Sequence, residues 1–340
     1  MENKKATIRD VAALANVSIA TISRYLNGNI PVADETGKRI AKAIESLSYT
    51  PDRIAKSLKT GRMNNIMHVV PDITNPYYAR MYRAVQGYAM QKGYTVMLYD
   101  TAALESNEEK AVQLFSNRDA DGLFFCTIDK NKTVFERLKA LNRPVVTNTR
   151  FDELLFDTIY SPGGHGIYIA AKHLLDLKHR DIAYAGGSAH SIVNMRRRSG
   201  FQKAMDEAGI HVHPDYFFEM DFTMDGGYRA GVYFAGLNRR PTAICCANDM
   251  IAMGVMQALN ERGIRIPDDI SLTGEDNIEY VQICRPGLTT THNPSDFVAE
   301  QAVKMLIERI EEQYTGSPRE VICSRELIVR NSTKALIQKQ

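Results

Sequence analysis

Small side chains and one arginine lie close together near the N-terminus, on what the spacing predicts to be a short helix. Ile22 and Leu26 have the spacing of an inward helical face. The same helix therefore presents a small outer face: Ile19, Ala20, Thr21, Ser23 and Arg24. A helix this short and small-faced fits the major groove of DNA. Ile19 and Ala20 offer only contacts to thymine methyl groups, so Arg24 is the polar contact expected to a guanine or a phosphate.

A pair of helices over residues 7–29 would hold that face outward. Thr7 is suited to cap the first helix, and Asp10 three residues later comes close to completing a capping box. An apolar stripe follows at helical spacing: Ile8, Val11, Ala12 and Ala15. Asn16 tolerates the left-handed conformation of a tight turn, and Ser18 can cap the second helix. An ordinary helical hairpin would show the same pattern.

The charge of the chain favours the DNA-reading interpretation over that alternative. Residues 1–62 contain 11 Lys and Arg against 6 Asp and Glu, a net charge of +5. The remaining 278 residues contain 31 against 34, a net charge of −3. A third predicted helix, Val32–Leu47, completes this basic segment. A basic head on a mildly acidic body is expected if one end of the chain meets phosphates.

From residue 63 onward, short apolar runs alternate with helical stretches. The runs predict seven strands: Ile66–Val70, Tyr94–Tyr99, Gly122–Cys126, Val145–Asn148, Ile182–Ala185, Ala243–Cys246 and Ile270–Thr273. Between them, helices are expected over Tyr77–Lys92, Glu108–Asn117, Gly166–Leu177, Arg197–Ala208, Gly226–Gly236 and Asp249–Arg262. Such alternation predicts parallel sheets built from crossovers. The elements exceed one sheet, so we expect two similar α/β lobes.

The chain resembles the LacI/GalR family of bacterial transcription regulators along almost its whole length. The family pattern T-x-x-D-V-A-x-x-A-x-V-S-x-x-T-[VI]-S-R-x-L-N runs from Thr7 to Asn27. Further matching motifs follow in order: YTPDRIAKSLKTGR (49–62), VVPDITNPYY (69–78), RRSGF (197–201), CANDMIAMG (246–254) and RELIVRNST (325–333). So many motifs in one order make the resemblance specific.

The resemblance implies a body of the periplasmic-binding-protein type, with a ligand crevice between lobes that three chain crossings join. We expect the crossings near Thr158–Pro162, Thr289–Pro294 and Ser324–Val329. The domains would then be a helix-turn-helix head (1–50), a hinge helix and linker (51–62) and an effector-binding and dimerisation body (63–340). Within the body, the N-lobe would comprise about 63–160 plus 293–325, and the C-lobe about 163–290 plus 327–340.

For DNA, the resemblance implies two identical heads of a homodimer on a pseudo-palindromic operator, with half-sites about one helical turn apart. The contacting residues would be Thr7, Ser18, Ile19, Ala20, Thr21, Ser23, Arg24, Asn27, Tyr49, Arg53, Ala55 and Leu58. Pro51 ends the third helix, and Asp52–Lys59 is shorter than the roughly 12–15 residues that an isolated helix needs. We therefore expect a hinge that folds on DNA and inserts Leu58 between base steps. A flexible tether is the alternative.

Polar and aromatic residues that follow the predicted strands form the candidate effector site. Asn75, Tyr77 and Tyr78 follow the first strand of the body, at the end where open α/β sheets bind ligands. By resemblance, effector contacts would come from Asn75, Tyr77, Tyr78, Arg150, Arg197, Phe222, Asn248 and Asp276. Alternatively, the tyrosines are core residues, Asn248 and Asp276 cap helices, and one of Arg196–Arg198 faces the crevice.

Several positions depart from the family pattern. Thr149 stands where an acidic residue is common, which makes the crevice more positive, and SPGGHG (161–166) replaces a common D-N-x-x-G stretch. In the head, Asp52 stands where Asn is common and Gly37 where Arg is usual. A glycine within a helix costs about 1 kcal/mol relative to Ala.

Little else in the sequence indicates chemistry. No G-x-S-x-G, H-E-x-x-H or P-loop pattern occurs, and the glycines at 163–166 lack dinucleotide-loop spacing, so a flexible crossing loop is expected. His211 and His213 are too few for a metal site, and His68 is expected in the core. The five cysteines lie in or beside apolar runs, as buried free thiols of a reducing cytosol do. Neither a membrane span nor a secretory signal is evident.

Two function classes remain open. The first is a cytoplasmic, nucleoid-associated transcription regulator, a repressor, that binds double-stranded operator DNA under control of a small effector and uses no cofactor or catalytic residue. The second is a sugar-binding protein or an NAD-linked enzyme that shares the α/β body. The effector would be a sugar or a sugar derivative, and Arg150 with Arg197 leaves an acidic or phosphorylated one open.

Overall fold

The computed structural model describes residues 6–27, 32–49, 61–150 and 153–336. They divide into two units, Met1–Met63 and Asn64–Gln340. The first unit contains helices α1 (Ile8–Ala15), α2 (Ile19–Asn27) and α3 (Asp34–Ser46). The predicted apolar positions form its core, in which Val11, Ala12, Ala15, Ile22 and Ile40 are buried. The apolar side chains that recur at helical spacing in the sequence therefore form the core that stabilises the head.

Local hydrogen bonds at the ends of α1 and α2 match the sequence prediction. The Asp10 carboxylate accepts from the Thr7 backbone N–H at 2.8 Å, and Asn16 has a positive φ of 50° that turns the chain. The Ser18 hydroxyl accepts from the Thr21 N–H at 3.1 Å. In addition, the Arg39 guanidinium donates to the carbonyl of Ala15 at 2.8 Å, which ties α3 to the turn.

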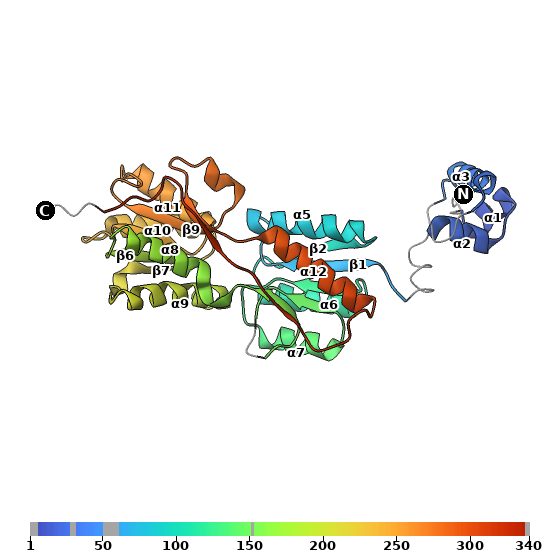
Figure 1. Ribbon diagram of the computed structural model, residues 1–340, viewed down its shortest axis with the longest axis horizontal. Helices are drawn as coiled ribbons and strands as arrows, with labels where there is room; N and C mark the ends of the chain where they lie inside the picture. The colour runs from blue at the N-terminus through green and yellow to red at the C-terminus, as the bar shows by residue number, and fades with distance from the viewer. Residues whose placement is uncertain (1–5, 28–31, 50–60, 151–152, 337–340) are drawn as a thin grey trace. The chain divides into compact units, whose positions relative to one another are not determined.

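The second unit contains two α/β lobes (Figure 1). The N-lobe sheet has the strand order β11-β5-β4-β3-β1-β2, with every pairing parallel. In that order the strands are Glu320–Ile322, Asp157–Tyr160, Val145–Thr147, Gly122–Phe125, Asn65–Val70 and Thr95–Asp100. One face is covered by α5 (Pro76–Gln91) and α12 (Ser295–Ile310), and the other by α6 (Glu105–Ser116) and α7 (Lys132–Leu141). Successive residues of β1 consequently enter two different cores, Ile66 one and Met67 the other.

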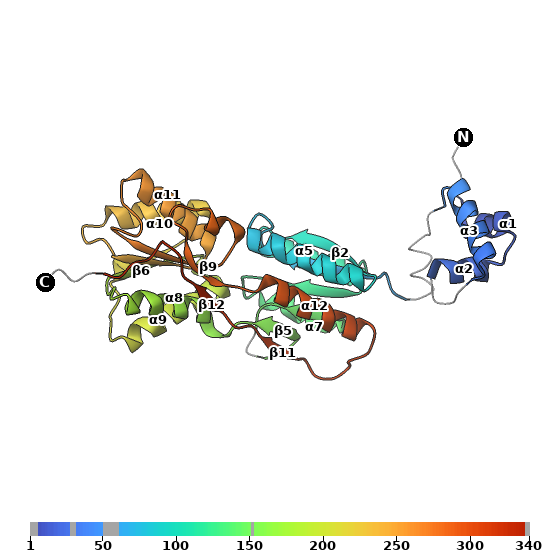
Figure 2. The same cartoon turned by 45° about the horizontal axis from the view of Figure 1, so that its top comes forward.

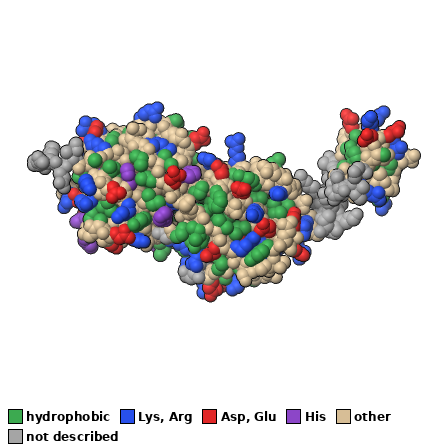
Figure 3. Space-filling model, in the orientation of Figure 1, with side chains coloured by type: hydrophobic (Ala, Val, Ile, Leu, Met, Phe, Trp, Pro, Cys, Tyr) green, Lys and Arg blue, Asp and Glu red, His purple; other side chains and the backbone are tan. Residues whose placement is uncertain are grey.

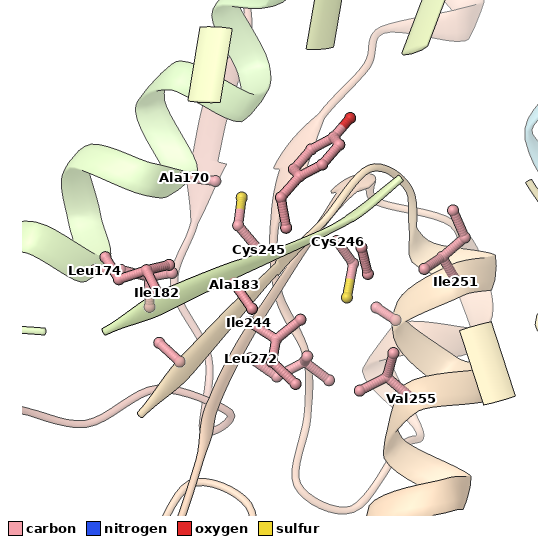
Figure 4. Packing of buried hydrophobic residues seen from close by; sticks show 14 of the residues in the cluster. Ala170, Leu174, Ile182, Ala183, Ile244, Cys245, Cys246, Ile251, Val255 and Leu272 are labelled. Atoms are coloured by element: carbon pink, nitrogen blue, oxygen red, sulfur yellow. The ribbon is translucent and has the colours of Figure 1, made fainter. Parts of the chain in front are cut away.

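The C-lobe repeats this layering with the strand order β12-β10-β9-β8-β6-β7. In that order the strands are Glu326–Ile328, Thr289–His292, Ser271–Asp276, Ala243–Cys246, Ile182–Gly186 and Phe217–Glu219. Only β12 runs antiparallel, against β10. The sheet lies between the α8–α9 pair (His165–Asp176 and Ile192–Glu207) and the α10–α11 pair (Met224–Gly236 and Asp249–Glu261). In Figure 4, Cys245 and Cys246 project from opposite faces of β8, as adjacent residues of a strand do.

Three segments of the described chain pass between the lobes. They connect β5 to α8, β10 to α12 and β11 to β12, and the last two run side by side in both ribbon views (Figures 1 and 2). Of the expected crossing segments, the first overlaps β5 and the second contains β10, the strands that lead into those crossings. The third contains β12, the strand that follows its crossing. The fold class predicted from the sequence, two α/β lobes with parallel sheets behind a helical head, is confirmed.

Some elements were not predicted. The sequence analysis did not predict five strands that are only three or four residues long (β5, β7, β10, β11 and β12). It also did not predict two helices, α7 and α12. Cys284 is half-buried rather than buried, unlike the other four free thiols. His68 is fully buried and stacks on Phe124 with 4.7 Å between ring centroids, as expected of a core residue. Within the described ranges, no helix is long and apolar enough to cross a bilayer.

Candidate DNA-reading face and effector cavity

The outer face of α2 is the candidate DNA-reading surface. Ser18, Ile19, Ala20 and Arg24 are exposed, whereas Thr21 is half-buried. Ile19 is 45% exposed, which is unusual for an isoleucine in a helical unit with a core of its own. Ile22, on the opposite side of α2, is buried in the core of the head, and this packing positions the outward side chains of α2.

The remaining predicted DNA contacts occupy different environments. Thr7 is exposed at the start of α1, Ser23 is half-buried, and Asn27 is the last residue of α2. Tyr49 packs against the head core. Three further residues, Arg53, Ala55 and Leu58, lie outside the described residues, as does most of the proposed hinge.

The body contains a cavity of about 820 Å³ between its two lobes. Its N-lobe walls come from the segments after β1, β2, β3 and β4, and its C-lobe walls from those after β6, β7, β8 and β9. The carboxyl ends of both parallel sheets thus point into one cavity, which is where open α/β sheets bind ligands. At one mouth the lobes touch, because the Ser191 hydroxyl donates to the Ile128 carbonyl at 2.6 Å.

A buried charged group lies at the C-lobe end of this cavity. One Arg197 guanidinium nitrogen lies 3.2 Å from Glu275 and 3.4 Å from Asp276, and these side chains are only 12%, 5% and 5% exposed. Arg325, from the third crossing, lies 3.6 Å from Glu275. Burial raises the pKa of Asp276 to about 6, and the nearby Arg197 charge opposes that rise. The two arginines and two carboxylates compensate one another here.

Seven of the eight predicted effector residues line the cavity: Asn75, Tyr77, Tyr78, Arg197, Phe222, Asn248 and Asp276. Tyr77 and Tyr78 meet edge to face with 5.1 Å between centroids and also pack against the lobe cores, so a place in the cavity wall is compatible with the core interpretation. The Arg197 guanidinium lies 5.6 Å from the Phe222 ring centroid. The cavity therefore offers aromatic faces beside carboxylates, amides and a guanidinium.

Two asparagines in the cavity wall also cap helices. The Asn75 side chain accepts from the Tyr77 N–H at 3.0 Å. The Asn248 side chain accepts from the Ile251 N–H at 2.8 Å and donates to the Phe222 carbonyl at 3.2 Å. The capping interpretation of Asn248 is thus compatible with a place in the wall.

Arg150 is the predicted effector residue that the structure places elsewhere. It does not line the cavity, and its guanidinium pairs with Glu320 at 2.6 Å. By contrast, both Arg196 and Arg197 line the cavity, so two residues of the run 196–198 face the crevice rather than one. Arg198 turns away and pairs with Glu219 at 2.7 Å.

Several lining residues were missed by the sequence analysis. Asn293 directly follows β10 and Arg325 directly precedes β12, and both lie within predicted crossing segments, which could have identified them. Glu275 is adjacent to the predicted Asp276. Glu108 and Asn131 gave no usable signal, because one stands in a charged helix start and the other precedes a helix that was not predicted.

The charge balance of the cavity wall is acidic. Three arginines and one lysine line it: Arg196, Arg197, Arg325 and Lys130. Seven carboxylates oppose them: Asp72, Glu105, Glu108, Asp129, Asp221, Glu275 and Asp276. The expectation drawn from Thr149 compares this crevice with those of family members, so this charge count does not test it and it stays a prediction. On the body face in Figure 3, basic and acidic side chains are interspersed rather than gathered in one patch.

The glycines of the first crossing have a packing role. Gly164 has a φ of 69°, and a Cβ atom there would lie 2.0 Å from the Arg196 carbonyl oxygen. Instead of a flexible loop, this crossing is a short 3₁₀ turn, Pro162–Gly164, packed against α9. Among the residues with described positions, no group of three or more His, Cys, Asp or Glu could hold a metal ion.

Comparison with known proteins agrees with this geometry. The family described as bacterial regulatory proteins, lacI family, matches residues 7–52, and the periplasmic binding protein-like domain matches residues 171–333. The HTH-type transcriptional repressor PurR of Vibrio campbellii is 33% identical over 333 residues, which cover 97% of this chain and 99% of that protein.

Solved structures show the same architecture. The lac repressor dimer bound to operator and the anti-inducer ONPF has a TM-score of 0.85 at 24% identity, covering 98% of this chain and 100% of that one. A LacI family transcriptional regulator from Enterococcus faecium with bound ribose has a TM-score of 0.70 at 26% identity, covering 80% and 100%. The chain belongs to the lacI family of bacterial regulatory proteins, whose members are DNA-binding transcriptional repressors rather than enzymes.

Proposed function

We propose that this repressor is controlled by a small effector that binds in the cavity between the lobes. The observation that carries the proposal is the convergence of seven sequence-predicted residues on one cavity of about 820 Å³. This volume falls within the range of roughly 300–1,000 Å³ typical of small-molecule sites. The second function class, an enzyme or a simple sugar-binding protein, accounts for this cavity but not for the basic head.

A sugar or a sugar derivative is the proposed effector. Phe222, Tyr77 and Tyr78 supply aromatic faces, while the carboxylate of Asp276 and the amide of Asn248 can pair with hydroxyl groups. The Enterococcus faecium relative with bound ribose supports this class. An acidic or phosphorylated effector fits less well, because Arg150 pairs outside the cavity and carboxylates outnumber cations in its wall.

The switch that we propose links the cavity to the DNA through residues 51–62. The chain would be divided into a head (1–50), a hinge helix and linker (51–62) and the body (63–340), with lobes bounded as the sequence suggests. Two chains would pair as a homodimer on a pseudo-palindromic operator in the cytoplasm. Effector binding would change the relation of the lobes and with it the spacing of the two hinges, which shifts the DNA-competent population.

Fluorescence anisotropy with the intact chain tests this function. Titration of labelled duplexes at several salt concentrations should give sequence-preferring binding that weakens steeply as salt rises. Effector candidates are sugars, sugar acids, sugar phosphates and nucleosides, first screened by thermal shift on the full chain. A compound that stabilises the body should change operator affinity, and the sign of the change distinguishes an inducer from a corepressor. Absence of sequence-preferring binding would remove the proposal.

A second titration addresses the hinge. Leu58→Ala should weaken specific operator binding, because it removes the side chain proposed to be inserted between base steps. Effector affinity serves as the internal control and should not change. Wild-type operator affinity in this variant contradicts the hinge assignment.

A further inference from the structure

The N-lobe end of the cavity contains a second cluster of polar groups, distinct from the Arg197 cluster. Glu105 and Glu108 lie in the first turn of α6, and Asp129 and Asn131 lie between β3 and α7. All four line the cavity. We call these four residues the acidic wall.

Glu108 is the buried member of the acidic wall. The residue is only 4% exposed, and its carboxyl Oε1 accepts a hydrogen bond from the Thr127 hydroxyl at 2.6 Å. The other oxygen, Oε2, is buried and has no hydrogen-bond partner within the described part of the chain. Burial raises the pKa of Glu108 to about 7, and the nearby Asp129 and Glu105 charges add to the rise. An unsatisfied buried carboxyl oxygen costs stability, so something must offset it.

Asn131 supplies the second unpartnered group. Its Oδ1 accepts from the Val134 N–H at 3.1 Å and so caps α7. The residue is 7% exposed, and its Nδ2 is buried without an acceptor among the described residues. The capping bond fixes the amide orientation, so Nδ2 remains free to donate to a ligand. The N-lobe end of the cavity thus has an unpartnered carboxyl oxygen, Glu108 Oε2, and an unpartnered amide donor, Asn131 Nδ2, among the described residues.

The helix dipole alone does not account for the acidic wall. Carboxylates in a first turn are favourable when exposed, and Glu105 meets that condition. Glu108 gains no such benefit from being buried with an unpartnered oxygen. A metal ion does not fit either, because no group of three or more ligating side chains occurs within the described ranges. An organic ammonium group needs fewer carboxylate ligands than a metal ion does, because a single carboxylate can accept a charge-assisted hydrogen bond from it.

We propose that the acidic wall binds the protonated amine of the effector, so that the effector is an amino sugar or a similar vicinal amino alcohol. The ammonium donates to Glu108 Oε2 within the field of Asp129 and Glu105, and the neighbouring hydroxyl accepts from Asn131 Nδ2. This inference rests on the proposed effector cavity and specifies its ligand. The cavity volume leaves room for a second ring to reach the Arg197 cluster.

Matched amine and hydroxyl ligands test the proposal by calorimetry on the full chain. The pairs are glucosamine with glucose, galactosamine with galactose, and the β-1,4-linked glucosamine dimer with cellobiose. At about pH 7.3, between the raised pKa of Glu108 and the usual pKa of an amino group, the amine of at least one pair should bind about tenfold more tightly than its partner, since charge-assisted hydrogen bonds are the stronger ones. Glu108→Gln should reduce the ratio of the two affinities to about one. Glu109 does not line the cavity, so Glu109→Gln should preserve the ratio.

Other outcomes overturn the proposal. They are an affinity ratio near or below one in every pair, no binding by either member of any pair, or a ratio that Glu108→Gln leaves intact. If sugars without an amine bind at least as tightly as their amine partners and change operator affinity, the acidic wall is not the subsite proposed, while effector control still stands. A thermal melt of both variants establishes that they fold.

Discussion

The two ends of the effector cavity handle buried charge in opposite ways. At the C-lobe end, Arg197 and Arg325 face Glu275 and Asp276, so that each buried carboxylate has a cation nearby. At the N-lobe end, the acidic wall has a buried carboxyl whose Oε2 lacks a partner within the described chain. The lobes share a layered architecture, so this difference comes from side chains rather than from fold.

Two asparagines repeat the contrast on a smaller scale. Asn248 and Asn131 both cap helices that begin at the cavity wall. The Asn248 amide also donates to the Phe222 carbonyl, whereas the Asn131 amide finds no acceptor among described residues. At the C-lobe end, Glu275 Oε2 and Arg325 Nε are also buried without a hydrogen-bond partner among the described residues. The two ends therefore differ in how charge is compensated, because arginines lie beside the C-lobe carboxylates.

The largest effect should follow from breaking the compensated end. Arg197→Ala leaves Glu275 and Asp276 without their closest cation, and removal of one partner of a buried pair costs about 3–5 kcal/mol. Urea unfolding at pH 8 should show this loss in the body. The loss should shrink at pH 5, because the pKa of Asp276 is already raised to about 6 and its protonation removes the uncompensated charge.

Arg198→Ala is the matched control for this prediction. Arg198 lies on the same helix but is 45% exposed and pairs with Glu219 outside the cavity. Exposed pairs contribute about 0–1 kcal/mol, so the control should lose little. Equal losses in the two variants would mean that burial does not distinguish the two arginines.

The same comparison shows what could be predicted from sequence. The positions that follow strands, such as Asn75, Asn248 and Asp276, were found because parallel strands bring their carboxyl ends to one edge. Arg197 was found by its motif, but its burial against two carboxylates was not, since that contact joins residues about 80 positions apart. Removal of Arg197 is consequently expected to cost stability as well as the proposed effector contact.

The acidic wall could not be predicted in this way. Glu108 stands in the sequence ESNEEK, which is typical of a solvated helix start, and only the packing of α6 beside the loop after β3 buries it. The short edge strands were missed for a similar reason. Three residues carry too little periodicity, so tertiary pairing decides their conformation.

An intermediate effect should follow from neutralising the uncompensated end. Burial raises the folded-state pKa of Glu108 to about 7, above the value of about 4.3 expected in an unfolded chain. Its ionised form therefore destabilises the fold as pH rises between these values, and the full penalty is present above the folded-state pKa. Glu108→Gln should stabilise the body by about 3–4 kcal/mol at pH 8.

The pH dependence separates this effect from a change in packing. At pH 4 the carboxyl is protonated in both states, so the gain from Glu108→Gln should vanish in urea unfolding curves. Glu109→Gln should change stability little at either pH, since this neighbouring side chain does not line the cavity. A gain that is equal at both pH values would refute the assignment of the penalty to ionisation.

The smallest effect should distinguish the two asparagines. A serine retains the ability to cap a helix, whereas an alanine does not and costs about 1 kcal/mol. Asn131→Ser should therefore stay within a few tenths of a kcal/mol of the wild type in thermal unfolding, because its amide donor has no partner to lose. Asn248→Ser should cost about 1 kcal/mol more, because the Phe222 carbonyl loses the donor of a partly buried hydrogen bond. Equal costs would show that both amides are satisfied alike, and the contrast between the two ends of the cavity would then be limited to its charges.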